Sequence, residues 1–199
     1  MIMAIEKKIK KRKTVDTWKK KEWYTIAAPK VFEEKEIGTT IASDEKSLAN
    51  RILNVPLREV TGNMNHQYVK LRLRVSEIKG KTAHTVMEGF ELVPEYLRRN
   101  IRRHRSIVKL VKDGTTKDGV KIRITAYVFT GRKVDTTKKD EIRKITDAYL
   151  TKEIPENTAE TIIQKCVFGT TPTEVLKQAK VVSPIKRVEI SKLKFVRGK

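Results

Sequence analysis

An alternation of apolar and basic residues over positions 68–93 constrains the fold of this chain more than any other feature of its sequence. In Val69–Val75, VKLRLRV, valine or leucine occupies every second position. The intervening basic residues are Lys70, Arg72 and Arg74. A period of two places successive side chains on opposite faces of a β-strand, so one face is buried and the other is basic. Lys79-Gly80-Lys81 supplies a turn, and Thr82–Val93 is predicted to return as the partner strand.

A second hairpin is predicted further along the chain. Ile107–Val111 is the first strand, Lys112–Gly119 contains the turn, and Val120–Phe129 is the second strand. Alternation in the second strand again gives one apolar and one basic face, the latter carrying Lys121 and Arg123. These strand cations indicate phosphate binding, although charge also protects edge strands from aggregation. Hairpin, helix and hairpin together predict a mostly antiparallel β core.

The segment between the hairpins, PEYLRRNIRRHRS (Pro94–Ser106), is predicted to be an arginine-rich helix. Pro94 suits the first helical position, and Tyr96, Leu97 and Ile101 are expected to anchor its inner side. The outward residues would be Arg98, Arg99, Arg102, Arg103 and Arg105. Guanidinium groups grip phosphates in pairs of hydrogen bonds and stack on unpaired bases. The alternative is a solvated helix face, which is disfavoured because no acidic residue follows Glu95 in the segment.

Residues 1–21 form a basic arm with too few apolar residues to build a core. Its cations include Lys7, Lys8, Lys10, Lys11, Arg12, Lys13, Lys19, Lys20 and Lys21. Such a block is predicted to become ordered on binding RNA. The alternative is a basic terminus or localisation signal that stays loose. Trp18, Trp23 and Tyr24 flank its last lysines and suit either base stacking or attachment to the core, and for Trp23 attachment is favoured.

Two more strands are predicted before the first hairpin, over Trp23–Ala28 and Glu36–Ser43. Asp44–Arg51 is polar and indicates a turn. Ile52–Val60 is interrupted by Pro56 and is compatible with either a helical turn or a strand.

The last third of the chain changes to a helical pattern. Helices are predicted over Lys138–Glu153, over Thr158–Val167 after a break at Pro155, and from Thr171 until Pro184. Residues 185–199 are predicted to form a second basic tail, despite some apolar alternation. Its expected RNA-binding residues are Lys186, Arg187, Lys192 and Lys194.

The predicted fold class is α+β, with an antiparallel β-barrel or sandwich core, peripheral helices and basic terminal extensions. The predicted organisation is an arm over 1–21, a mainly β core over 22–135, a helical part packed on it over 136–184, and a tail over 185–199.

The charge balance indicates a polyanionic partner. Lys and Arg number 45 against 24 Asp and Glu, a formal net charge of +21 at pH 7. Solubility needs only about 2–8 net charges on a small domain. Nucleic acid is the commonest intracellular polyanion; an anionic membrane surface is the alternative, which no strongly amphipathic helix supports. The longest stretch without charged residues, Val60–Val69, has ten residues, far short of a membrane span.

No motif argues for catalysis, a cofactor or a metal. The first residues, MIMAIEKKIKKRK, lack the apolar region of a secretory signal, and a single cysteine suggests a reducing compartment. Cys166 is predicted to be a buried small hydrophobe. Asp113 and Asp118 each precede a glycine and are predicted to be turn residues. The histidines, His66, His84 and His104, show no metal-ligand spacing.

Several segments resemble a known family. They are DTWKKKEWYTIAAPKVFEEKEIGTTIA (Asp16–Ala42), TTKDGVKIRITAYVFT (Thr115–Thr130), EIRKITDAYLTKEI (Glu141–Ile154) and PTEVLKQAKVVSPIKRVEISKLK (Pro172–Lys194). In this order they resemble the archaeal and eukaryotic small-subunit ribosomal protein S-three-a-e family, and the length resembles its archaeal form.

The resemblance implies a structural, cytoplasmic, ribosome-bound protein on the platform of the small subunit near the mRNA exit. Its implied partners are small-subunit rRNA, including the region of the 3′ end, neighbouring ribosomal proteins, and mRNA near the exit. It implies no cofactor, and it supplies no individual functional residues. Two rival functions are a free-standing RNA- or DNA-binding regulator and an RNA-modifying enzyme.

Overall fold

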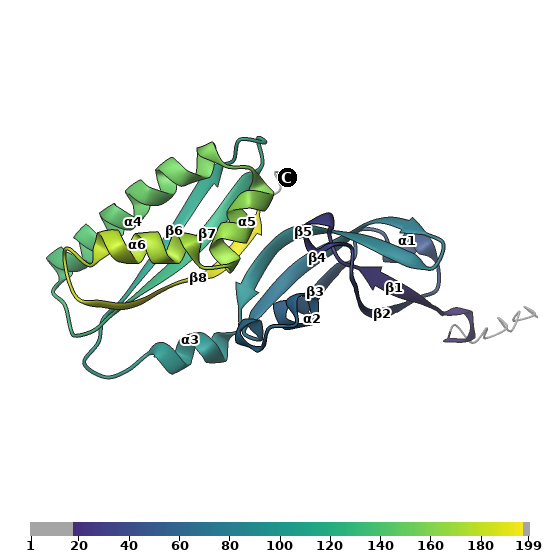
Figure 1. Ribbon diagram of the computed structural model, residues 1–199, viewed down its shortest axis with the longest axis horizontal. Coiled ribbons are helices and arrows are strands. Elements are labelled where there is room, and N and C mark those ends of the chain that lie inside the picture. Colours follow the sequence, from purple (N-terminus) through teal and green to yellow (C-terminus); the bar gives the residue numbers. More distant parts are fainter. Residues whose placement is uncertain (1–17, 197–199) are drawn as a thin grey trace, which may run out of the picture.

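The computed structural model describes residues 18–196, apart from the side chain of Asn65 (Figure 1). Its strands are β1 (Glu22–Ala27), β2 (Glu36–Ala42), β3 (Ile52–Pro56), β4 (Val69–Lys79), β5 (Thr82–Leu92), β6 (Ile107–Thr115), β7 (Lys121–Thr130) and β8 (Ile185–Phe195). Its α-helices are α1 (Glu45–Leu48), α2 (Leu57–Thr61), α3 (Pro94–Asn100), α4 (Thr136–Glu156), α5 (Ala159–Val167) and α6 (Thr170–Ala179). Three single 3-10 turns lie at Trp18–Lys20, Lys30–Phe32 and Met64–His66.

All eight strands belong to one sheet that branches at β5. The main strand order is β2-β1-β5-β8-β7-β6. β4 pairs with the other edge of β5, and β3 pairs with the far edge of β4. All pairings are antiparallel except that of β1 with β5. No pairing within residues 18–196 joins β6 back to β2 or β3, so the predicted barrel is wrong. The mixed, mostly antiparallel core is confirmed, and the sandwich alternative stays a prediction.

Gly89 lies where β8 joins β5. The first part of β5, Thr82–His84, pairs with β1, whereas Gly89–Glu91 pairs with β8. Gly89 has a φ of +146°, and a Cβ there would lie 2.1 Å from the backbone carbonyl oxygen of Leu193. Only a residue without a side chain allows the two backbones to approach this closely.

The helices of the carboxy-terminal half cover one face of β6–β8 (Figure 1). The largest core cluster combines buried residues of β4 and β7 with residues of α4 and α5, for example Leu73, Ile124, Leu150 and Ile163. This cluster crosses the branch of the sheet. The strands before α3 and the strands and helices after it therefore share one hydrophobic core, and each part contributes to the stability of the other.

Both predicted hairpins are present, as β4–β5 and β6–β7, and the two early strands form β1 and β2. The undecided segment Ile52–Val60 contains both alternatives. β3 ends at Pro56, whose backbone is extended, and α2 begins at the next residue. Pro155 does not break the preceding helix; it lies inside the last turn of α4, which continues to Glu156.

The predicted arginine helix is much shorter than expected. α3 ends at Asn100, and Ile101 is extended and 51% exposed, so its predicted anchoring role is wrong. Short helices depend on tertiary packing, and Ile101 has no core to pack against. Arg102, Arg103 and Arg105 consequently lie in the loop that leads to β6.

The predicted carboxy-terminal tail is wrong over most of its length. Ile185–Phe195 is β8, which lies between β5 and β7 inside the sheet. Val188, Ile190 and Leu193 are all buried, and Leu193 is completely so. Their alternation was the sequence signal for this strand.

Candidate nucleic-acid interface

The face of the sheet that points away from α4 and α5 carries most of the predicted strand cations. On β4, β7 and β8 the buried residues point toward the helices, which leaves the alternating basic residues on the opposite face. We call this surface the outer basic face, defined by Lys70, Arg72, Arg74, Lys121, Arg123, Lys192 and Lys194. The prediction that each of these strands has one apolar and one basic face is confirmed for β4 and β7.

Strand register brings these cations into rows that cross the sheet. Arg72 lies opposite Gly89, Gly89 lies opposite Lys194, and Lys194 lies opposite Arg123. Lys70, Glu91 and Lys192 form the adjacent row. Because neighbouring strands lie about 4.8 Å apart, residues far apart in sequence come within reach of one anionic chain.

Lys194 is repelled by the cations beside it on this face. The pKa of Lys194 is lowered, first by the charge of Lys192, then by partial desolvation and by Arg72. The buried Nε of Arg72 has no hydrogen-bond partner. A like-charge cluster of this kind favours an anion, because bound phosphates would relieve the repulsion.

Two residues of the outer basic face are already engaged by carboxylates. Lys192 Nζ lies 2.7 Å from Glu91 Oε2, and the Arg123 guanidinium donates two hydrogen bonds, of 2.6 and 2.7 Å, to Asp113. These bonds lower the pKa of the Asp113 carboxyl. The predicted turn position of Asp113 is wrong, since this residue lies in β6 opposite Arg123. Arg72, Arg74 and Lys194 belong to none of the ion pairs found within residues 18–196.

Asp118, the second aspartate, does lie in the turn between β6 and β7. Its Oδ2 accepts a hydrogen bond of 2.9 Å from the backbone N–H of Ala159, the first residue of α5. The contact attaches the β6–β7 turn to the helical layer and satisfies one of the free donors of the helix end. Asp118 is therefore a structural residue.

Arg187 has a structural role at the junction of α3 and β8. It donates a hydrogen bond of 2.7 Å to the Tyr96 hydroxyl, which in turn donates one of 3.0 Å to Glu189 Oε1. The Arg187 Nε also lies 3.4 Å from that carboxylate oxygen. Burial raises the pKa of Glu189, while Tyr96 and Arg187 favour its charged form. This network holds α3 against β8 and reduces the charge that Arg187 offers to a ligand.

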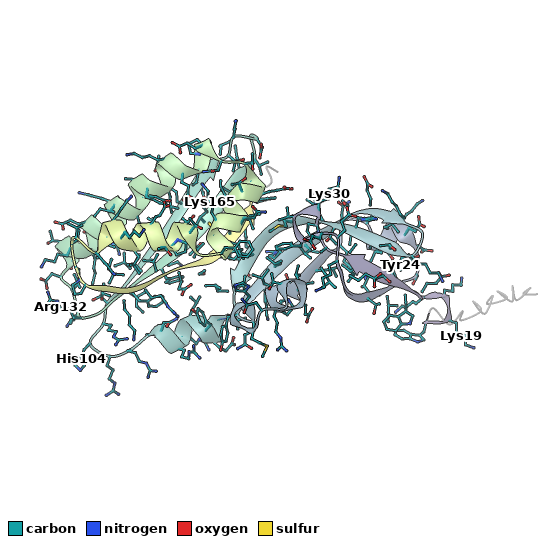
Figure 2. All side chains as sticks on the ribbon, viewed as in Figure 1. Lys19, Tyr24, Lys30, His104, Arg132 and Lys165 are labelled. Atoms are coloured by element: carbon teal, nitrogen blue, oxygen red, sulfur yellow. The ribbon has the colours of Figure 1, made fainter. Side chains whose placement is uncertain are left out.

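The remaining predicted arginines and Lys186 are spread over the surface. Arg98 and Arg99 lie exposed in the last turn of α3, whereas Arg102 and Arg103 lie exposed in the following loop. Arg105, in the same loop, is half-buried, and Lys186 is exposed near the start of β8. Figure 2 shows His104, within this loop, at the end of the molecule opposite Lys19.

The predicted amino-terminal arm falls largely outside the described residues. Lys7, Lys8, Lys10, Lys11, Arg12 and Lys13 all lie there. Lys19, Lys20 and Lys21 are exposed next to β1, and Lys21 Nζ lies 4.3 Å from the ring centroid of Trp18.

The two tryptophans of this region are 63% and 62% exposed, at Trp18 and Trp23 respectively. The attachment of Trp23 to the core is therefore wrong. Tyr24, on the other face of β1, is the buried residue.

The one cysteine is structural. Cys166 is buried among the core residues, as predicted, and burial raises its pKa to about 12. A thiol with this pKa is a poor nucleophile at neutral pH. Across residues 18–196, no three His, Cys, Asp or Glu side chains are grouped so that they could hold a metal ion. None of the helices in the described part of the chain is long and apolar enough to cross a membrane.

Sequence reasoning missed the aromatic neighbours of the arginine segment. The rings of Tyr68 and Tyr96 stack with centroids 4.6 Å apart, and the Arg99 guanidinium lies 5.5 Å and 5.8 Å from them. The only sequence signal for Tyr68 was its place just before the first alternating strand.

Comparisons with known proteins show that this chain is similar to ribosomal proteins. Residues 9–198 match the model of the ribosomal S3Ae family. The chain is 36% identical over 185 residues to small ribosomal subunit protein eS1 of Methanothermobacter thermautotrophicus, covering 93% of this chain and 95% of the relative. It is also 36% identical to the proteins of the same name from Sulfurisphaera tokodaii and Methanobrevibacter smithii, covering 92% and 94% of this chain and 95% and 96% of the relatives.

Proposed function

The chain belongs to the ribosomal S3Ae family, and we propose that it is a structural protein of the small ribosomal subunit whose outer basic face binds the backbone of folded rRNA. The observation that carries the RNA-binding part is the row Arg72–Lys194–Arg123, built by strand pairing across four neighbouring strands with Gly89 between the first two side chains. Arg72 and Lys194 are the members outside the ion pairs of residues 18–196, whereas Arg123 is paired with Asp113. Each member comes from a different strand, so the folded sheet itself creates the site.

The charges on this row suit a backbone rather than a base sequence. The positive charges of Lys192 and Arg72 disfavour the charged form of Lys194. Several bound phosphates would relieve this repulsion, so the face suits an RNA backbone. Strands fix the cations at regular spacings, and the described residues contain no cluster of ligands for a zinc module. Phosphate contacts of this kind position a protein on folded RNA.

Within the subunit, we propose a place on the platform near the mRNA exit, in contact with the region of the rRNA 3′ end, neighbouring ribosomal proteins and exiting mRNA. Membership of the family supports the general position, and the names of the relatives support assembly into the small subunit. The protein would be cytoplasmic because its ribosomes are. Its role would be structural rather than catalytic, as the family implies.

Incorporation into subunits tests the proposal. The variant Arg72→Gln/Lys194→Gln should co-sediment with small subunits at a clearly reduced level after a high-salt wash, because two cations of the row are lost. Lys138→Gln/Lys144→Gln is the matched control, since it removes two exposed lysines from α4 on the opposite side. Equal incorporation of both variants would contradict the assignment of the face. Release of the unaltered protein at moderate salt would instead indicate a transiently bound regulator.

A further inference from the structure

A pocket opens where β5 and β8 separate. The two strands pair only through Gly89–Glu91 and Lys192–Lys194, and the earlier part of β8 has no partner on that edge within residues 18–196. α3 and the segment before β4 border the resulting space, which has a volume of about 550 Å³. Its walls include His66, Tyr68, Tyr96, Arg99, Arg187 and Glu189.

Planar groups are concentrated in this pocket. Tyr68 and Tyr96 stack at an interplanar angle of 25°, and Arg99 and Arg187 lie 5.8 Å and 5.9 Å from the Tyr96 ring centroid. The His66 ring, in the wall of the pocket, also meets Phe168 edge-on at 6.1 Å; Phe168 itself is 54% exposed and lies outside the pocket wall. The aromatic groups are therefore held by the fold at a surface opening, instead of being enclosed in a core.

The chemistry of the walls favours one class of ligand. Rings and guanidinium planes offer stacking surfaces that every nucleobase can use. Arg99 is exposed and belongs to none of the ion pairs formed within residues 18–196, so its charge is available to an adjacent phosphate. A volume of 550 Å³ is within the usual range for small-ligand pockets, about 300–1,000 Å³.

We propose that this pocket binds one unpaired base of single-stranded RNA, stacked on the Tyr68–Tyr96 wall, with Arg99 on a flanking phosphate. The inference rests on the proposed function, because it takes RNA as the ligand. It goes further by assigning a second mode of contact. The outer basic face binds the backbone of folded RNA, whereas the pocket captures a base that is free of pairing.

Short RNA oligonucleotides test the pocket on the full chain. A hexanucleotide that carries 2-aminopurine at one position and abasic sites at the other five should lose fluorescence on binding, because stacking quenches this base. Tyr68→Leu should weaken the binding about tenfold, as expected for the loss of one stacked base. Tyr68→Phe keeps the ring and should bind within about twofold of the unaltered protein.

A hexamer with the same backbone but an abasic site at that position separates stacking from charge. It should bind about tenfold more weakly than the 2-aminopurine hexamer, and equally to the unaltered protein and to Tyr68→Leu. Equal affinity of the unaltered protein for both hexamers would overturn the pocket. Arg99→Gln, at an exposed position, should weaken the binding of both hexamers. If Tyr68→Leu unfolds, an unchanged affinity of Arg99→Gln for both overturns the proposal.

The two proposals fail in different ways. Tyr68→Leu should still bind a folded rRNA transcript through the outer basic face. If the transcript binds but the hexamer shows no dependence on its base, only the pocket is wrong; if the hexamer binds and the transcript does not, the proposed function is wrong. Ultraviolet cross-linking of assembled subunits should attach a nucleotide to the peptide containing Tyr68 or Tyr96. A protein cross-link there without a nucleotide would overturn the RNA assignment.

Discussion

The arginine segment Arg98–Arg105 has a higher density of cations in the sequence than any strand of the outer basic face, yet the fold orders the cations of the strands more precisely. On the outer basic face, strand register fixes each cation beside a specific neighbour on another strand. In the arginine segment, the helix ends at Asn100 and the cations divide between a short helix and a loop. The difference shows that charge density in the sequence does not decide how cations are arranged in the fold, whereas the backbone ladder that holds them does.

The largest expected effect concerns the strand that creates the outer basic face. Leu193→Ala should lower the free energy of unfolding by about 2–5 kcal/mol, because this fully buried leucine of β8 packs in the main core. Val196→Ala, just past the strand at a position 38% exposed, is the control and should change it by no more than about 0.5 kcal/mol. Urea denaturation measures both. Equal, small effects would mean that residues 185–196 behave as a tail. The outer basic face would then be no better ordered than the arginine segment.

The next effect tests the junction of the row. Gly89→Ala should cost about 2–4 kcal/mol, because the new methyl group would meet the Leu193 carbonyl oxygen in a backbone conformation that alanine rarely adopts. Gly80→Ala is the control. It also has positive φ, +59°, but its Cβ would meet no atom within 4 Å, and about 1 kcal/mol is expected. If urea denaturation gives the same cost for both, close approach of β5 and β8 is not required.

A smaller effect is expected when the RNA affinities of variants in the two regions are compared directly. At about 0.1 M salt, Arg72→Gln/Lys194→Gln should weaken binding to a small-subunit rRNA transcript about tenfold, and Arg102→Gln/Arg103→Gln about threefold. Binding through the loop arginines costs more conformational entropy, because the loop must become ordered, and this offsets more of their favourable binding free energy. A filter-binding titration measures both dissociation constants, and the reverse order would assign the main contact to the loop.

The smallest expected effect is a pH dependence of stability at the α3–β8 junction. Burial raises the pKa of Glu189 above its unfolded value, so the folded state holds this proton more tightly. The resulting contribution to stability is complete below the ordinary pKa of glutamate and is lost as pH rises through the raised value. Thermal unfolding between pH 4 and 8 should therefore show a shallow decline that Glu189→Gln reduces. A Glu189→Gln protein with an identical pH profile would contradict this.

The sequence predicted the two hairpins and their basic faces because a period of two is a local signal. Val69–Val75 needs no knowledge of its partners to place Lys70 and Arg72 on one face. The same signal existed in β8 at Val188 and Ile190, but the basic residues on either side of this pair, Lys186, Arg187, Lys192 and Lys194, suggested a tail. Its central position depends on non-local facts, namely the close approach at Gly89 and the helices that cover Leu193.

The arginine segment could not be predicted for a related reason. The helical pattern of Tyr96, Leu97 and Ile101 assumes a surface that receives all three side chains, but the first two are only half-buried and Ile101 is exposed. The aromatic pocket was equally hidden, since Tyr68 and Tyr96 are separated by the whole β4–β5 hairpin and meet only after it folds.

The salt dependence of rRNA binding tests the central claim most directly. The logarithm of the association constant should fall linearly with the logarithm of salt concentration, and each phosphate contact contributes about 0.7–0.9 to the slope. If the outer basic face binds the backbone, Arg72→Gln/Lys194→Gln should reduce the slope by about 1.4–1.8, while Lys138→Gln/Lys144→Gln leaves it unchanged. An unchanged slope in the first variant would contradict the account.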